Sequence, residues 1–200
     1  MKIPASFYLQ EDVIEISKQL LGKVLCTQIE GEELTAGIIV ETEAYAGVTD
    51  KASHAYQSKK TPRTQTMYQI GGTSYVYLIY GCYHLFNIVT HKIDVPHAVL
   101  IRAIEPIQGV ETMQKRRKLE KFSNKISAGP GLLTQALGIN KMHNGLSLTE
   151  SNIWLEDQGI SVSKNNIIAS PRVNVSYAAE DALLPWRFRI KNNKWVSPAK

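Results

Sequence analysis

The strongest constraint on the fold comes from residues 71–90, a segment dense in tyrosine and in aliphatic residues. Residues of these types favour strands, and Gly81 inside the segment suits a tight turn. We therefore predict a β-hairpin with a strand, a turn at Gly81 and a returning strand. Because successive side chains on a strand point to opposite faces, alternation groups Tyr75, Tyr77 and Ile79 against Val76, Leu78 and Tyr80.

The tyrosines of this hairpin indicate a binding surface. A protein core holds few tyrosine hydroxyls, since each buried hydroxyl needs a hydrogen-bond partner. The alternation predicts that Tyr77 and Tyr80 point to opposite sides and that Tyr80 lies at the tip of the hairpin. Such a concentration of rings is typical of a surface that stacks against something flat.

A second feature is the segment VETEAY at residues 40–45, which follows an apolar run. Strand alternation would place Ile39, Glu41, Glu43 and Tyr45 on one face, with same-face neighbours roughly 6 to 7 Å apart. Glu43 and Tyr45 could then line one pocket, where the carboxylate would do acid or base chemistry beside the ring. The pattern alone leaves two alternatives open. Glu41 fits the same position as Glu43, and the strand could simply leave the core for solvent.

The rest of the chain predicts an α+β fold, with helices flanking an antiparallel sheet. The helical spacing of apolar residues and the positions of glycine predict helices over residues 11–21, 109–122 and 132–137. Alternating or apolar segments predict strands over residues 23–28, 34–43 and 98–103, with a turn at Gly31 and with Glu105-Pro106 ending the last strand. The long polar loop at residues 46–66 is expected to carry function.

The last fifty residues are strand-like and include a clear alternation near residue 190. Trp186, Phe188 and Ile190 are expected in the core, and Arg187, Arg189 and Lys191 are expected to face outward. Outward-facing arginines at this position would be suited to contact phosphates.

Composition limits the class of protein. A chain of 200 residues with 44% hydrophobic content suits one globular domain spanning residues 1–200. A net charge of +5 and a pI of about 9.1 point in the direction of a polyanionic partner. The two cysteines have no metal-ligand spacing, so no metal site is expected. No segment reads as a signal peptide or a membrane span, so we expect a soluble cytoplasmic protein.

Six short motifs carry a family resemblance, in order and in register: VETEAY at 40–45, His54, TPR at 61–63, YVYLIYG at 75–81, Asn87 and LIRAIEP at 100–106. Together they resemble the alkyladenine (3-methyladenine) DNA glycosylases of the mammalian and bacterial type. The likeness runs from the first helix to Trp195-Val196-Ser197. It implies one mixed domain around a curved antiparallel sheet, with a hairpin at about residues 73–90 that projects into the minor groove of DNA.

The resemblance implies an enzyme that excises damaged purines from duplex DNA, such as 3-methyladenine, 7-methylguanine, hypoxanthine and ethenoadenine. A base inside a duplex cannot be reached, so such an enzyme must rotate the nucleotide out and fill the gap. By resemblance, Tyr80 is the wedge that fills it. No cofactor is implied, and a monomer associated with the bacterial nucleoid is expected.

The resemblance also assigns the pocket. The extruded purine would lie between Tyr45 and the pair Tyr77 and His54, where stacking is worth roughly 1 to 3 kcal/mol per base. An electron-rich tyrosine face adds cation–π attraction for purines that carry a positive charge. Asn87 would approach the purine edge and disfavour the 2-amino group of guanine.

The chemistry needs few groups. A cationic purine leaves readily, so one general base can suffice where ordinary glycosidases need two carboxyls. By resemblance Glu43 is that base, activating a water against the sugar C1′, and Arg102 orients the carboxylate and its water. No lysine matches a Schiff-base role, so the expected enzyme is monofunctional and leaves an abasic site.

Contacts to the DNA backbone are expected from Thr61, Arg63, Gly81 and Cys82. Cys82 stands where a methionine is familiar in mammalian members, so its smaller side chain is expected to fill less of the vacated stack. Two other classes compete with the glycosylase: an inert damaged-DNA-binding protein with the same aromatic pocket, and a hydrolase of free nucleosides. Glu43 argues against the first, and the basic balance with the projecting Tyr80 argues against the second.

Overall fold

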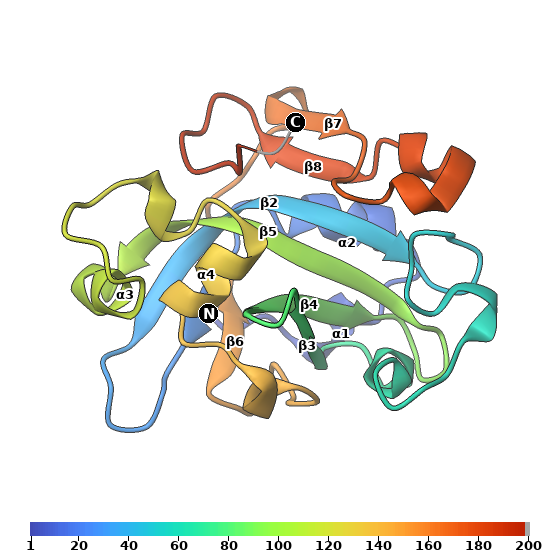
Figure 1. Cartoon of the computed structure of the whole chain (residues 1–200), viewed down its shortest axis with the longest axis horizontal. Helices are drawn as coiled ribbons and strands as arrows, with labels where there is room; N and C mark the ends of the chain where they lie inside the picture. The colour runs from blue at the N-terminus through green and yellow to red at the C-terminus, as the bar shows by residue number, and fades with distance from the viewer. Residues whose placement is uncertain (199–200) are drawn as a thin grey trace.

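One antiparallel sheet of eight strands organises residues 1–198, the part of the chain that the computed structural model describes (Figure 1). The strands are β1 (Val24–Thr27), β2 (Thr35–Ala46), β3 (Ser74–Ile79), β4 (Tyr83–Thr90), β5 (His97–Gln108), β6 (Ile153–Glu156), β7 (Ile167–Ser170) and β8 (Arg187–Ile190). The helices are α1 (Ala5–Tyr8), α2 (Val13–Gln19), α3 (Val110–Arg116) and α4 (Pro130–Ala136). The α+β fold predicted from the sequence is confirmed.

The sheet is built around β2. Strands follow the order β3-β4-β5-β2-β1-β6, and β5 pairs with β2 along nearly its whole length. On the other edge of β2, β1 pairs with residues 35–38 and β8 pairs with residues 41–43. Register shifts flank Glu41, at the point where the partner on that edge changes. Bulges of this kind shift the pairing of a strand. Glu41, Glu43 and Tyr45 nevertheless share one side, since Arg102 contacts both carboxylates and the Tyr45 hydroxyl donates to Glu43.

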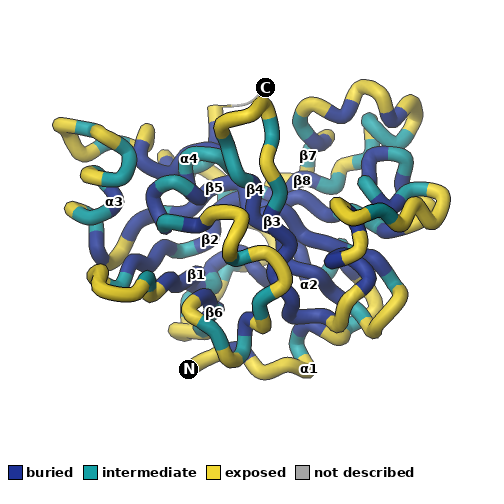
Figure 2. The backbone as a smooth tube through the Cα atoms, turned by 60° about the horizontal axis from the view of Figure 1, so that its bottom comes forward, coloured by how far each residue is buried: buried dark blue, intermediate teal, exposed yellow. Residues whose placement is uncertain are grey.

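Helices cover both faces of the sheet. In Figure 1, α2 lies behind β2 and α4 lies in front of β5. The Ser17 hydroxyl of α2 donates to Thr42 Oγ1 over 3.0 Å, which places Thr42 on the α2 face. Its neighbour Glu43 therefore points to the α4 face. The tube in Figure 2 shows the buried backbone concentrated in the sheet, with exposed loops around it.

The tyrosine-rich hairpin predicted from the sequence is confirmed as β3 and β4. Tyr80 and Gly81 both have positive φ, 53° and 69°, and the Cys82 N–H donates to the Ile79 carbonyl over 3.2 Å. Two successive residues with positive φ match the right-handed twist of a hairpin, and Gly81 adopts this backbone without a steric penalty. The expected turn at Gly31, between β1 and β2, is also present.

Some element boundaries were wrong. β5 continues through Glu105-Pro106 to Gln108, because a register shift where Pro106 faces Gly37 accommodates the missing N–H of proline. The helix expected over residues 109–122 ends at Arg116, since Lys118 turns to a φ of 51°. The helix expected over residues 11–21 is α2, which begins after Asp12, whose carboxylate accepts from the Ile14 and Glu15 N–H groups.

The expected outward direction of Arg187 was also wrong. Its side chain is buried, and its Nε donates to Glu41 Oε1 over 2.8 Å. The reason is the branching of the sheet: β8 pairs with β2 so that Arg187 lies opposite Glu43, and its side chain reaches the nearby buried Glu41 carboxylate instead of solvent. Among the described residues, every helix is too short or too polar to cross a membrane.

Candidate functional site

A pocket of about 680 Å³ opens beside the hairpin and reaches the β2–β5 pair. Three cross-strand pairs of the hairpin contribute side chains to it: Tyr75 with Asn87, Tyr77 with Leu85, and Ile79 with Tyr83. The predicted face of Tyr75, Tyr77 and Ile79 therefore lines a cavity. From the opposite side α4 supplies Gly131, where an added Cβ would lie 2.7 Å from the Tyr83 ring.

Glu43 lies in this pocket as a carboxylate with fixed partners. Its side chain is fully buried. Oε1 accepts from the Val173 N–H over 2.8 Å and lies 3.2 Å from Arg102 Nη1, and Oε2 accepts from the Tyr45 hydroxyl over 2.9 Å. Three donors, one from the same strand and two from distant parts of the chain, thus fix the orientation of one carboxylate.

Glu41 has a separate role on the same side of the strand. Its Oε1 accepts from Arg102 Nε over 2.7 Å and from the Ser197 hydroxyl over 2.9 Å, and its Oε2 accepts from the Ser197 N–H over 2.6 Å. With Arg187 as a further donor, Glu41 is a buried counter-ion. It is absent from the residues that line the pocket within the described chain, whereas Glu43 lines it. Arg102 joins the two carboxylates.

Aromatic rings form two sides of the pocket. His54 contacts the Tyr77 ring with centroids 4.8 Å apart, and its Nδ1 lies 3.0 Å from the Tyr75 hydroxyl. Burial, helped by the nearby cations Arg63 and Lys59, lowers the pKa of His54 to about 4, so the ring is neutral at pH 7. Burial and the adjacent charge of Glu43 raise the pKa of Tyr45, which keeps its hydroxyl protonated as a donor.

Asn87 is buried on β4, and its Nδ2 donates to the Tyr75 carbonyl over 3.1 Å. This bond fixes the amide beside the hairpin rings, with the side chain at the pocket wall. The structure thus brings together six of the residues singled out from the sequence: Glu43, Tyr45, His54, Tyr77, Asn87 and Arg102.

The tip of the hairpin forms the rim. Tyr80 is 75% exposed and also lines the pocket mouth, so the strand alternation that placed it opposite Tyr77 does not extend into the turn. Gly81 and Cys82 are exposed beside it. Thr61 lies apart in a turn, where its N–H donates to Thr64 Oγ1 over 2.8 Å. The Arg63 guanidinium lies 4.9 Å from the centroid of the Tyr77 ring, close to the pocket.

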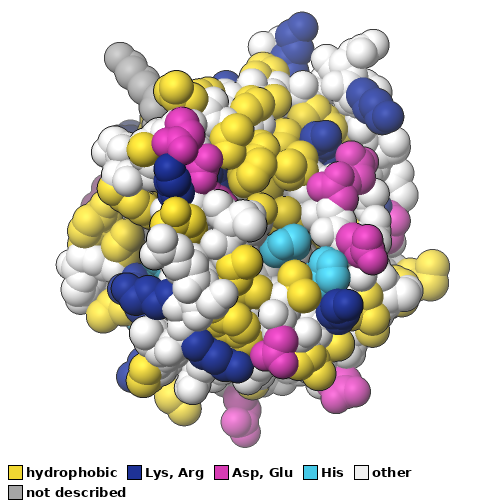
Figure 3. Space-filling view, turned by 90° about the vertical axis from the view of Figure 1, so that its right-hand side faces the viewer, with side chains coloured by type: hydrophobic (Ala, Val, Ile, Leu, Met, Phe, Trp, Pro, Cys, Tyr) yellow, Lys and Arg dark blue, Asp and Glu magenta, His cyan; other side chains and the backbone are white. Residues whose placement is uncertain are grey.

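The surface around this region is mixed in charge. Figure 3 shows the face that includes the loop after β2, where apolar side chains gather and Lys, Arg, Asp and Glu are spread around them. The positive charges on this face form no single continuous patch. Residues 1–198 contain no group of three or more His, Cys, Asp or Glu side chains that could hold a metal ion.

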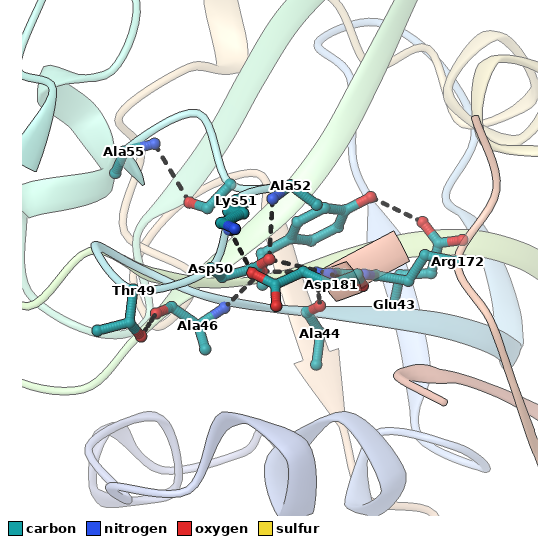
Figure 4. A network of polar contacts seen from close by, with 12 residues as sticks. Glu43, Ala44, Ala46, Thr49, Asp50, Lys51, Ala52, Ala55, Arg172 and Asp181 are labelled. Atoms are coloured by element: carbon teal, nitrogen blue, oxygen red, sulfur yellow. Dashed lines mark hydrogen bonds and ion pairs between the residues drawn. The ribbon is translucent and has the colours of Figure 1, made fainter. Parts of the chain in front are cut away.

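Sequence reasoning missed an arginine behind the pocket. Arg172 binds Asp50 through two bonds, Nη1 to Oδ2 over 2.6 Å and Nη2 to Oδ1 over 2.9 Å. Its guanidinium lies 4.8 Å from the centroid of the Tyr45 ring, and Figure 4 shows the network that joins this segment to β2 and the following loop. No periodic pattern marked residues 172–177. Tyr75 and Tyr83, by contrast, could have been added from the hairpin alternation.

Comparisons with a family model and with known proteins point to the same family, and the matches cover nearly the whole chain. The model of the methylpurine-DNA glycosylase (MPG) family matches residues 6–194. A protein of Clostridium perfringens named "Putative 3-methyladenine DNA glycosylase" is 44% identical over 98% of this chain and 99% of its own length. Two further proteins carry the same name. The one from Chlamydia felis is 46% identical over 97% of this chain and 100% of its own length, and the one from Bacillus cereus is 43% identical over 98% of this chain and 99% of its own length.

Proposed function

The chain belongs to the methylpurine-DNA glycosylase family of hydrolytic N-glycosylases of DNA repair, and on this premise we propose that it rotates damaged purines out of duplex DNA into the aromatic pocket, where Glu43 acts as general base. The observation that carries the proposal is the buried Glu43 carboxylate, oriented by three donors, in a pocket whose rim is the exposed turn of a hairpin.

Entry of the base begins at the rim. Tyr80 is 75% exposed at a two-residue turn, so its ring can enter a base stack and occupy the space that a rotated nucleotide leaves. Gly81 and Cys82 beside it, with Thr61 and Arg63 on the loop after β2, are the proposed contacts to the DNA backbone. Contacts of this kind orient the protein without reading sequence.

The purine then stacks between Tyr45 and the pair Tyr77 and His54. His54 is neutral, so it adds no positive charge to this wall beyond that of Arg63, whose guanidinium lies 4.9 Å from the centroid of the Tyr77 ring. Asn87 is fixed through its Nδ2, so its amide presents one defined edge to the purine. We propose that this edge disfavours normal guanine by its 2-amino group, and that the substrates include methylated, deaminated and etheno purines.

In the chemical step a water attacks the sugar C1′ and gives its proton to Glu43. The electrons of the broken N-glycosidic bond remain on the departing purine, and the product is an abasic site. Arg102 lies 3.2 Å from Glu43 Oε1, so it orients the carboxylate toward the attacking water. One general base is sufficient for a cationic purine, which leaves as a neutral molecule. A neutral purine leaves as its anion and takes a proton from solvent. We propose a monofunctional enzyme that acts as a monomer, because one chain supplies all the groups named here.

The test is excision from labelled duplexes that contain hypoxanthine or ethenoadenine, followed by alkaline cleavage of abasic sites. We expect activity in the wild type and a loss of about 10²- to 10⁴-fold in Glu43→Gln. Glu105→Gln is a matched control, since Glu105 lies on β5 outside this pocket and accepts from Asn193. A wild type that binds damaged DNA but releases no base would make the protein a damage-binding protein. Strand cleavage without alkali would contradict the monofunctional mechanism.

A further inference from the structure

Arg172 holds a positive charge against one face of the Tyr45 ring. The residue is 5% exposed, and its guanidinium lies 4.8 Å from the centroid of Tyr45 and 5.1 Å from that of Trp186. Within the described chain, Tyr45 lines the pocket and Arg172 does not. The guanidinium therefore covers the ring face turned away from the pocket.

The position of this charge is fixed by the groups around it. Asp50 binds both Nη atoms, and the carbonyls of Ala44 and Asp181 accept from Nη1 and Nη2 over 2.9 and 3.1 Å (Figure 4). Asp50 in turn accepts from the N–H groups of Ala46 and Ala52, so its negative charge is shared among backbone donors as well. These bonds lie along the edge of the guanidinium, and they leave its faces to the two rings.

A cation behind a ring changes what the front of the ring attracts. The faces of an aromatic ring carry negative potential, which is the origin of cation–π attraction. A second cation on the opposite face is repelled by the first across the thin ring, in a buried site where screening is weak. A neutral purine avoids this repulsion, because it carries no net charge.

We propose that Arg172 is a specificity-determining residue, which lowers the preference of the pocket for cationic over neutral damaged purines by placing a positive charge behind Tyr45. This inference rests on the proposed function of the pocket. It explains how one tyrosine wall serves charged 7-methylguanine and uncharged hypoxanthine alike. Arg172 contacts no substrate and acts only through Tyr45.

The experiment compares single-turnover excision of 7-methylguanine and of hypoxanthine from duplexes of the same sequence. In the double variant Asp50→Asn/Arg172→Gln, which removes both charges and leaves no unpaired buried ion, the ratio of the two rates should rise about fivefold in favour of 7-methylguanine. Arg172→Lys keeps the charge and should keep the ratio within about twofold of wild type. Glu180→Gln, which removes the Lys51 salt bridge on the same loop, is the matched control and should not move the ratio.

Loss of rigidity alone would lower both rates together, so the ratio separates it from the charge effect. If the first double variant does not fold by circular dichroism, Asp50→Asn/Arg172→Met provides a second neutral pair with an apolar side chain against both rings. An unchanged ratio in the neutral pair, or a wild type that excises only one of the two bases, overturns the inference and leaves the proposed function standing. A wild type that excises neither base overturns both.

Discussion

Replacing Glu41 by glutamine should destabilise the protein far more than the same change at Glu43. Glu41 is fully buried and is the counter-ion of Arg102 and Arg187, whose Nε atoms lie 2.7 and 2.8 Å from its Oε1. Glutamine removes the negative charge and brings an NH₂ group toward donors that need an acceptor. Removing one partner of a buried ion pair costs about 3 to 5 kcal/mol. For a chain of this size, each kcal/mol lowers Tm by about 2 to 4 °C, so we expect a fall of about 6 to 20 °C.

Glu43→Gln should cost little stability and most of the excision rate. Arg102 is the cation at Glu43, at 3.2 Å, and it keeps Glu41 as a second partner. An amide oxygen can still accept from a neutral donor such as the Val173 N–H, so we expect a stability loss of about 1 kcal/mol. The excision rate should fall about 10²- to 10⁴-fold, since an amide cannot take the proton of water.

The assay is thermal unfolding followed by circular dichroism, together with single-turnover excision at a temperature where both variants are folded. Glu105→Gln, on the same sheet but outside the pocket, should change neither quantity beyond error. A Tm for Glu41→Gln within about 2 °C of wild type would refute the reasoning on the buried counter-ion. A wild-type rate in Glu43→Gln would remove it as the base.

Three further predictions concern pH, the hairpin tip and salt. Because the pKa of His54 falls from its ordinary 6.5 to about 4 on folding, the unfolded chain binds a proton that the folded chain does not between these values. Stability should therefore fall as pH drops through this window, by about 1 kcal/mol at pH 5.5 from this group. His54→Gln should abolish that part of the slope in urea unfolding at several pH values, and an equal slope in both proteins contradicts the prediction. Tyr80→Ser should slow capture of the rotated base, and Leu78→Ser, which changes another exposed side chain of the hairpin, should not. Stopped-flow fluorescence of an ethenoadenine duplex measures this rate, and equal effects of the two variants would remove Tyr80 as the wedge. Affinity for duplex DNA should decline steeply with salt in fluorescence anisotropy, because phosphate contacts release counterions, and a flat response would argue against a backbone interface.

Local sequence patterns were sufficient to predict the hairpin and to predict which of its side chains share the face that lines the pocket. Alternation has a period of two whatever the rest of the chain does, so Tyr75, Tyr77 and Ile79 could be grouped before any contact was known. The same rule failed wherever the backbone left regular geometry. It misplaced Tyr80, which lies in a turn with positive φ, and it could not anticipate the register shifts around Glu41.

The amino-acid sequence by itself determined the α+β class, the hairpin with its ring-lined face and the candidate pair Glu41 and Glu43, because these depend on residue type and short spacing. The choice between the two glutamates on physical grounds needed the tertiary structure. The partners of Glu41 come from 61, 146 and 156 residues away, in Arg102, Arg187 and Ser197. Whether a carboxylate is a buried counter-ion or lines a pocket depends on which distant donors reach it, and no local spacing records that.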